Sequence, residues 1–356
     1  MSQATPFAEA SVDCALIPHA IACSNGLTVT VLPYGGRIQS IKWHGQELTL
    51  SQADPAFYLT DSAALGASVG RYANRIANAA YTDTAGTEWR LNASQPPHCL
   101  HGGEQGFAKR VWTVLEHSAD SLLLALVSGH GDQGFPGTLT VRQQLRVVDT
   151  VDTDGKPAGE LQLSFTAMTD AETVVNLTNH CYFNLAPQQT VEALAAHQLE
   201  LMAEQYLAVD ASGIPLPDAF RPLTGHEFDF RVATAVGPLC RQTADLPHGL
   251  DHCFVYQVVA KSPAPDPVPL RARLRYSTGG SIGDSTVDSP RTLELRSTQP
   301  GVQVYVGTYL TKPFAPFQGI CLEAQNFPDA PNRADFPSAV LRPGELYQQQ
   351  IFYRFS

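Results

Sequence analysis

The sequence is poor in charged residues, lacks any long apolar run and contains no CxxC pair. Charged residues make up 16% of the 356 residues, and the formal net charge is −11. This acidic balance argues against a nucleic-acid partner or an anionic membrane surface. Because no apolar run approaches about 20 residues, no membrane-spanning helix is expected. The N-terminus also lacks the basic and apolar segments of a secretory signal.

Seven cysteines are spread along the chain, an odd number without the spacing of a zinc site. Most of them lie among apolar residues, which is typical of reduced, buried thiols. The sequence therefore predicts a cytoplasmic protein that needs no disulfide, no metal and no other cofactor.

Glycine and proline are plentiful, with 27 and 26 residues, and helical patterns are few. Several short segments alternate apolar and polar residues, as strands with one buried face do. Strands are predicted at residues 139–147, 161–167, 302–307 and 347–355. Residues 149–160 are expected to form a long exposed loop, and a short helix is predicted at 191–197. These features predict an all-β fold, a large antiparallel β-sandwich, in a single domain spanning residues 1–356.

One segment breaks the strand pattern. Residues 261–269 (KSPAPDPVP) carry prolines at alternate positions, which forbid a central strand. We expect a surface connection within one domain.

The most informative stretch is residues 176–186 (NLTNHCYFNLA). With the period of a strand, one face is mostly apolar and the other is polar. The polar face would carry Asn176, Thr178, His180, Tyr182 and Asn184. A solvent-facing strand would normally carry Lys and Glu instead. Amides, hydroxyls and an imidazole suit a concave site that hydrogen-bonds a polyhydroxylated ligand.

Two arginines and Asn74 fall within residues 70–76 (GRYANRI). Arg75 could offer its donors to hydroxyls or to a developing oxyanion, but such clusters are more often surface turns with solvated arginines. The preceding residues 66–70 (GASVG) fit the nucleophile elbow of serine hydrolases. No buried apolar strand precedes them, so a hydrolase is not favoured.

Residues 98–107 (HCLHGGEQGF) contain two histidines and two adjacent glycines. His98 is expected to be an exposed loop histidine. The glycines after His101 would allow the backbone to approach a ligand closely, but an ordinary loop role for His101 remains equally open. The spacing of the two histidines matches no strong zinc pattern.

Three further residues could transfer protons or bind hydroxyls. His180 titrates near neutrality when unperturbed, so it could donate or accept a proton. Alternatively, it is a core histidine that is hydrogen-bonded to neighbouring amides. Asp251 begins a predicted strand, where it could accept hydrogen bonds from vicinal hydroxyls or simply end a turn. Glu323 has apolar neighbours and no basic residue nearby. Partial desolvation would raise its pKa and make it a base near pH 7, although a solvent-facing glutamate is an equal alternative.

Taken in order, these motifs resemble the aldose 1-epimerases, also called galactose mutarotases. The resemblance extends over about residues 66–356, and several ordered blocks are more specific than any one of them. The matching segments are residues 70–76, 100–103 (LHGG), 106–107 (GF), 111–112 (VW), 177–185, 228–231 (FDFR), 251–252 (DH), 303–305 (QVY), 322–325 (LEAQ), 327–330 (FPDA), 336–338 (FPS) and 341–347 (LRPGELY).

The resemblance implies a β-supersandwich of antiparallel sheets with a sugar on one concave face. It places Glu323 as the general base, His180 as the general acid and His101 as the second active-site histidine. The implied sugar-binding residues are Asn74, Arg75, Asp251 and Gln303.

Two segments depart from the family pattern. Residues 262–288 are longer and more polar than expected, and residues 306–308 (VGT) stand where the family often has Thr-Gly-Asn. Either change could alter the rim of the site and the choice of substrate.

The implied activity is interconversion of the α and β anomers of free aldohexoses such as D-galactose and D-glucose. Acid/base ring opening and reclosure would need no cofactor or metal. The expected partner is a small monosaccharide, and the chain is expected to be a monomer or homodimer. Two alternatives are a non-catalytic carbohydrate-binding protein and a hexose-phosphate mutarotase of the same fold, which should gather extra cationic residues.

Overall fold

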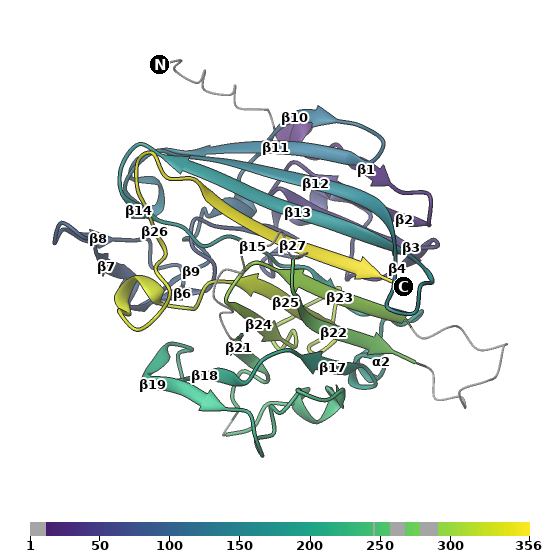
Figure 1. The fold of residues 1–356 in the computed structure, drawn as a ribbon. Coiled ribbons are helices and arrows are strands. Elements are labelled where there is room, and N and C mark those ends of the chain that lie inside the picture. Colours follow the sequence, from purple (N-terminus) through teal and green to yellow (C-terminus); the bar gives the residue numbers. More distant parts are fainter. Residues whose placement is uncertain (1–11, 245, 257–267, 278–290) are drawn as a thin grey trace.

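The computed structural model describes residues 12–244, 246–256, 268–277 and 291–356, and nearly all of their regular structure is antiparallel β-sheet (Figure 1). This confirms the predicted all-β fold. Within these residues the largest sheet has nine strands in the order β10-β11-β12-β13-β27-β23-β22-β17-β20. These strands are β10 (Thr113–His117), β11 (Ser121–Ser128), β12 (Leu139–Val151), β13 (Pro157–Thr169), β27 (Tyr347–Phe355), β23 (Arg291–Ser297), β22 (Leu270–Tyr276), β17 (Gln198–Leu201) and β20 (Thr234–Ala235).

Two smaller sheets and four two-stranded ribbons complete the β-structure of the described residues. The six-stranded sheet contains β16 (Tyr182–Phe183), β25 (Ile320–Gln325), β24 (Gly301–Tyr305), β21 (Asp251–Val255), β18 (Gln205–Val209) and β19 (Pro215–Pro222). The four-stranded sheet contains β1 (His19–Ala22), β2 (Leu27–Leu32), β3 (Arg37–Trp43) and β4 (Gln46–Glu47). The ribbons pair β14 (Thr173–Val174) with β26 (Val340–Leu341), β15 (Thr178–Asn179) with β5 (Ser68–Val69), β6 (Arg75–Ile76) with β9 (Cys99–Leu100), and β7 (Ala80–Thr82) with β8 (Glu88–Arg90).

Helices are short. The α-helices are α1 (Val12–Ala15) and α2 (Val191–Ala195), and the 3₁₀ helices are η1 (Pro55–Leu59), η2 (Ala77–Ala79), η3 (Phe107–Lys109), η4 (Asp132–Gly134), η5 (Gly237–Leu239) and η6 (Ala330–Asn332). The predicted helix at 191–197 is present as α2, where the Thr190 hydroxyl caps the N-terminus by accepting from the Ala193 N–H. Among the described residues, no helix has the length and apolar character needed to cross a membrane.

The β12–β13 hairpin shows how the sequence alternation produces the large sheet. Leu139, Val141, Leu145 and Val147 are buried together with Gln143, while Thr140, Arg142, Gln144 and Arg146 on the opposite face are partly or fully exposed. The predicted long loop at 149–160 is wrong, because β12 continues to Val151 and β13 begins at Pro157. Asp152 makes the short turn possible, since its carboxylate accepts backbone N–H groups from Asp154 and Lys156. The strands predicted at the end of the chain are also present, as β24 and β27.

The main hydrophobic core lies between the nine-stranded sheet and the two smaller sheets. Strands β1 and β2 contact β11, β12 and β13, so the four-stranded sheet covers one half of the large sheet (Figure 1). On the other half, Phe183 of β16 packs its ring 5.3 Å from that of Tyr353 on β27. One continuous cluster of buried apolar side chains extends from Ile21 to Phe355. The six-stranded sheet is thereby fixed against the large sheet on one face.

The prediction that residues 176–186 form one strand with a polar face on a site is wrong. They contain two short strands, β15 and β16, and all eleven residues are buried. Most of the polar side chains satisfy backbone groups of neighbouring segments. Asn176 donates to Ala73 O at 3.1 Å, and Thr178 donates to Ala324 O at 2.9 Å. These hydrogen bonds offset the cost of burying the polar groups and join the segment to β25.

The proline-rich connection predicted at 261–269 lies almost wholly outside the described residues. Within the longer polar segment 262–288, the described part forms β22, a strand of the nine-stranded sheet. That strand contributes no side chain to the pocket described below.

Candidate active site

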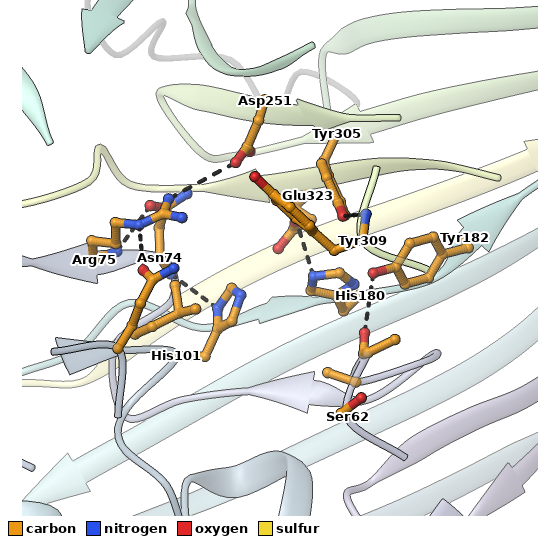
Figure 2. Close-up of a pocket in the computed structure, with 14 residues that line it drawn as sticks. Ser62, Asn74, Arg75, His101, His180, Tyr182, Asp251, Tyr305, Tyr309 and Glu323 are labelled. Atoms are coloured by element: carbon orange, nitrogen blue, oxygen red, sulfur yellow. Dashed lines mark hydrogen bonds and ion pairs between the residues drawn. The ribbon is translucent and has the colours of Figure 1, made fainter. Parts of the chain in front are cut away.

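A pocket of about 180 Å³ lies over one end of the six-stranded sheet, where several loops close around it (Figure 2). Its volume suits a ligand the size of one monosaccharide. The lining residues are Ser62, Ala63, Ala64, Asn74, Arg75, Gln95, Leu100, His101, His180, Tyr182, Asp251, Tyr305, Tyr309 and Glu323. Six of the seven residues predicted for the site are therefore brought together from five distant parts of the chain.

Strand register places the acidic side chains on one face. Glu323 of β25 lies opposite Gln303 of β24, and Asp251 of β21 lies opposite Tyr305 of β24. Because side chains alternate along a strand, Gln303 and Tyr305 share a face, and their partners join them on it. The pairing of three neighbouring strands thus brings together residues far apart in sequence.

Glu323 is a buried carboxyl, with only 2% of its surface exposed. Its Oε2 atom is also buried and has no hydrogen-bond partner within the described chain. Burial raises the pKa of Glu323 well above its usual range, and the charge of Asp251 raises it further, while Arg75 opposes the rise. The predicted desolvation is confirmed, and an unpaired oxygen in this position is suited to accept a hydroxyl hydrogen.

His180 lies beside Glu323, with 3.7 Å between its Nε2 and Oε1 of the carboxyl (Figure 2). Backbone hydrogen bonds to Gly66 and Ala67 fix its position between β15 and β16. Burial lowers the pKa of His180 to about 4. Burial therefore disfavours the charged forms of both residues, and at rest their shared proton favours the carboxyl.

His101 has a defined tautomer. Its Nδ1 accepts a hydrogen bond from the Asn74 backbone N–H at 3.2 Å, so the proton of the neutral ring is on Nε2. Burial lowers the pKa of His101 well below its usual value, and the nearby His180 and Arg75 lower it further. His101 is thus a neutral donor whose N–H is available to a ligand in the pocket.

Gly102, directly after His101, allows a close approach of the protein's own backbone, a role that the prediction did not include. Gly102 has φ of +80°, and a Cβ there would lie 2.1 Å from Gly70 O. This contact packs the His101 loop onto the segment that carries Asn74 and Arg75. The close approach helps to hold both segments at the pocket.

The arginines of residues 70–76 are buried, so the prediction of a surface turn with solvated arginines is wrong. Arg71 donates to the carbonyl oxygens of Ser128, Pro136 and Gly137, away from the pocket. Arg75 lines the pocket instead. Its Nε donates to Gln95 Oε1 at 2.8 Å, and its Nη1 lies 3.9 Å from Asp251 Oδ2. Local spacing could not reveal this burial, because the covering segments are remote in sequence.

Gln303 does not line the pocket, although the family resemblance implies a sugar-binding position. Only 3% of it is exposed, and its Nε2 donates to Asp251 Oδ1 at 2.6 Å. Gln303 therefore orients the Asp251 carboxylate. Asp251 is partly exposed, so its carboxylate is accessible to a ligand in the pocket.

Three tyrosines also form the pocket, and only Tyr182 was part of a predicted polar face. Tyr182 donates its hydroxyl proton to Ala63 O at 3.1 Å. The Tyr305 hydroxyl accepts the backbone N–H of Tyr309 at 2.8 Å, which places the Tyr309 ring at the rim (Figure 2). Thr308, within the departing segment 306–308, points away and donates to His248 O. Alternation along β24 could have indicated Tyr305, but no sequence signal places Tyr309 or Gln95.

Two other predicted features prove structural. His98 is buried rather than exposed; its Nδ1 accepts the Asn78 N–H and its Nε2 lies 3.1 Å from Ser212 Oγ. Ser68, the serine of the GxSxG match, is buried in β5 and donates to Gly36 O. Neither residue lines the pocket, and the buried hydroxyl of Ser68 is no nucleophile.

Ligand atoms of His101, His180 and Glu323 lie within 4.8 Å of one another, as in some metal sites. The donor set does not fit a metal. His101 would have to bind a metal through Nε2. Because Nδ1 accepts the backbone N–H of Asn74, the ring proton is on Nε2, and this nitrogen has no lone pair for a metal. The arrangement instead offers a hydrogen-bond donor, an imidazole and a carboxyl to one small ligand.

Comparison with known proteins establishes the family. A family model described as aldose 1-epimerase matches residues 19–354. The chain belongs to the aldose 1-epimerase family, whose members are isomerases. The aldose 1-epimerase of Escherichia coli K12 is 35% identical over 346 residues, covering 93% of this chain and 92% of that protein. The galactose mutarotase of Homo sapiens is 33% identical over 340 residues, covering 93% and 89%.

Solved structures show the same fold. The aldose epimerase homologue from C. elegans superimposes with a TM-score of 0.81 at 28% identity, covering 96% of this chain and 98% of that one. The galactose 1-epimerase from Lactobacillus acidophilus gives a TM-score of 0.76 at 23% identity, with coverage of 95% and 93%, a likeness of fold alone. The predicted supersandwich is thus the fold shared with aldose 1-epimerases.

Proposed function

We propose that this chain catalyses the interconversion of the α and β anomers of free aldohexoses such as D-galactose and D-glucose. The observation that carries the proposal is the pair formed by Glu323 and His180. A buried carboxyl and a buried imidazole lie 3.7 Å apart in a pocket of monosaccharide size. The hydroxyl on carbon 1 and the ring oxygen of a pyranose are attached to the same carbon, so one such pair can serve both.

In this mechanism Glu323 takes the proton from the hydroxyl on carbon 1, and protonated His180 gives a proton to the ring oxygen. The bond between carbon 1 and the ring oxygen breaks, which yields the open-chain aldehyde. Rotation about the carbon 1–carbon 2 bond presents the other face of the carbonyl. Closure then reverses both proton transfers, so the pair regains its starting protonation state.

The pKa shifts make both transfers favourable. The reacting form, carboxylate with imidazolium, has the same number of protons as the neutral pair. Burial makes this charged form less stable, so the imidazolium becomes a stronger acid and the carboxylate a stronger base. Sugar hydroxyls that donate to Glu323 help to form the charged state when substrate binds.

Neighbouring residues supply orientation and charge stabilisation. The Nε2–H of His101 and the guanidinium of Arg75 are donors suited to a developing negative charge on the substrate. Asp251 and Asn74 would hold other hydroxyls and so fix the ring relative to the acid/base pair. Gln303 would act through Asp251, because its hydrogen bond orients that carboxylate.

A phosphorylated hexose is a poorer candidate substrate. Among the described residues that line the pocket, Arg75 is the only arginine or lysine. Its guanidinium is already directed to Gln95 and Asp251. A dianionic phosphate would meet the negative charge of Asp251 without a second cation to offset it.

Polarimetry of freshly dissolved α-D-galactose and α-D-glucose tests the function. We expect the purified protein to accelerate the approach to anomeric equilibrium for both sugars and to have little effect on glucose 6-phosphate. Sugar binding by calorimetry without any acceleration would instead establish a carbohydrate-binding protein. Faster equilibration of the phosphate ester than of the free sugars would favour the hexose-phosphate alternative.

We further propose a cytoplasmic location and a monomeric or homodimeric state. The thiols of Cys99, Cys181, Cys253 and Cys321 are buried, as suits a protein kept in a reducing compartment. Light scattering of the purified chain would measure its oligomeric state directly.

A further inference from the structure

The two ring nitrogens of His180 face two residues of the same strand. Nε2 lies 3.7 Å from Glu323 Oε1, and Nδ1 lies 3.5 Å from Cys321 Sγ. Cys321 and Glu323 are two positions apart on β25, so both side chains project from the same face of the sheet. Strand β25 therefore places a side chain next to each of the two ring nitrogens of His180.

Proton transfer through Nε2 places a requirement on Nδ1. When protonated His180 gives its Nε2 proton to the sugar, the neutral ring must keep its remaining proton on Nδ1. Only this tautomer leaves a lone pair on Nε2 that can take the proton back. An acceptor next to Nδ1 favours the required tautomer and fixes the ring plane.

We propose that Cys321 is the positioning residue for His180: the Nδ1–H donates to Sγ, so that Nε2 is the nitrogen that exchanges its proton with the substrate. The kinetic consequence rests on the proposed anomer interconversion. The tautomer assignment does not rest on that function, because it is argued from the contact between the two side chains.

A neutral sulfur suits this task better than the carboxylate that often partners a histidine. A carboxylate at Nδ1 would stabilise the imidazolium and weaken it as an acid. Cys321 is fully buried, and burial raises the pKa of its thiol well above the usual range, so the group stays uncharged. Tyr182 and Tyr305 lie opposite Cys321 on the two neighbouring strands and help to cover it. The sulfur is a weak acceptor that orients the ring without adding charge.

Three variants separate this role from simple packing. Cys321→Ala removes the acceptor, and Cys321→Ser retains one in nearly the same place. Cys181→Ala is the matched control, because it also removes a buried thiol from a residue next to His180, but one that packs into the main core. Thermal unfolding of each variant confirms that it is folded.

The first measurement is ¹⁵N–¹H correlation NMR of the His180 ring, assigned by its loss in His180→Asn. Wild type, Cys321→Ser and Cys181→Ala are expected to show the neutral ring protonated at Nδ1, and Cys321→Ala a mixture of tautomers. The second is polarimetry. We expect kcat to fall about tenfold in Cys321→Ala, to stay within about threefold in Cys321→Ser and to be unchanged in Cys181→Ala. KM should change little, because Cys321 does not line the pocket.

A wild-type ring protonated at Nε2 would overturn the proposal, since the thiol would then be the donor. An unchanged kcat in Cys321→Ala, with the wild-type tautomer retained, would overturn it as well. If wild-type protein accelerates no anomer exchange, the proposed function fails, and the NMR result still decides the tautomer.

Discussion

At the residue scale, the proposed chemistry depends on two side chains with opposite pKa shifts. Glu323 and His180 share one proton. The active pair holds this one proton both as the neutral carboxyl with neutral imidazole and as the carboxylate with imidazolium. Below about pH 4, the shifted pKa of His180, the pair gains a second proton and loses its base. Above the raised pKa of Glu323 it loses its only proton and with it the acid. We therefore expect kcat to be highest between these limits, which belong to the pair rather than to either residue.

Burial has the largest effect on both limits, and Asp251 also shifts both of them. Its negative charge raises the pKa of Glu323 and also that of His180. Replacing it by the isosteric, neutral residue in Asp251→Asn should move both limbs of the kcat–pH profile to lower pH. Measurement of kcat across the pH range in wild type and variant checks this. An alkaline limb that stays in place or moves upward would contradict the assignment.

Sequence reasoning succeeded at this scale where chemistry is local. The apolar neighbours of Glu323 indicated its desolvation, and the family motifs indicated that Glu323 and His180 would lie in one pocket. Gln303 was predicted to bind the ligand. Its actual partner is Asp251 on the neighbouring strand, and this contact depends on strand register, which the sequence does not show. Local spacing alone favoured solvated residues at Arg71 and Arg75, because the segments that cover them are distant in the sequence. The family motifs nevertheless placed Arg75 in the sugar site.

At the element scale, the turn between β18 and β19 packs against the guanidinium of Arg75 and limits its position. Gly213, in this turn, has φ of +84°, and a Cβ there would lie 2.7 Å from Arg75 Nη1. Gly213→Ala should displace the guanidinium from Gln95 and Asp251 and raise KM several-fold for hexoses, with a smaller change in kcat. Steady-state polarimetry measures both constants.

Gly225→Ala is the matched control for this prediction. Gly225 has a similar φ of +76°, but a Cβ there would meet no atom within 4 Å. Both substitutions should cost about 1 kcal/mol of folding stability, because alanine tolerates positive φ poorly. Only the first should raise KM. An equal rise in both variants would mean that backbone strain, rather than contact with Arg75, is responsible.

Elements with regular alternation were predicted well, and irregular ones were not. β12, β13, β24 and β27 follow from apolar residues at every second position. Residues 176–186 have the same alternation, yet they cross from one short ribbon into the six-stranded sheet and are buried on both faces. Apart from His180, most of their polar side chains form hydrogen bonds with backbone groups, a demand that only the tertiary arrangement creates.

At the scale of the whole molecule, one hydrophobic core joins the three large sheets. Single-domain behaviour predicts one cooperative unfolding transition. Phe183 connects the six-stranded sheet to Tyr353 of the nine-stranded sheet, so Phe183→Ala should lower the free energy of unfolding by about 3–5 kcal/mol. Urea denaturation followed by tryptophan fluorescence and by circular dichroism checks both points. Two separate transitions would show that the sheets belong to independent units.

The all-β class could be predicted from the chain as a whole, because alternating segments, glycine and proline leave little room for helices. The closure of the pocket could not. Gln95 and Tyr309 reach it from loops whose paths depend on contacts such as Tyr305 with the Tyr309 backbone. The fold brings these loops to the end of β24 and β25, beside Glu323 and His180.

The central claim is that Glu323 and His180 act together on one sugar. The most direct measurement is the rate of α-to-β exchange of D-galactose, by polarimetry, for Glu323→Gln, His180→Asn and the double variant. Each single substitution should lower kcat by about 10³-fold or more, and the double variant should be hardly slower, because either loss disables the pair. Substantial activity in Glu323→Gln, or losses that multiply in the double variant, would contradict it.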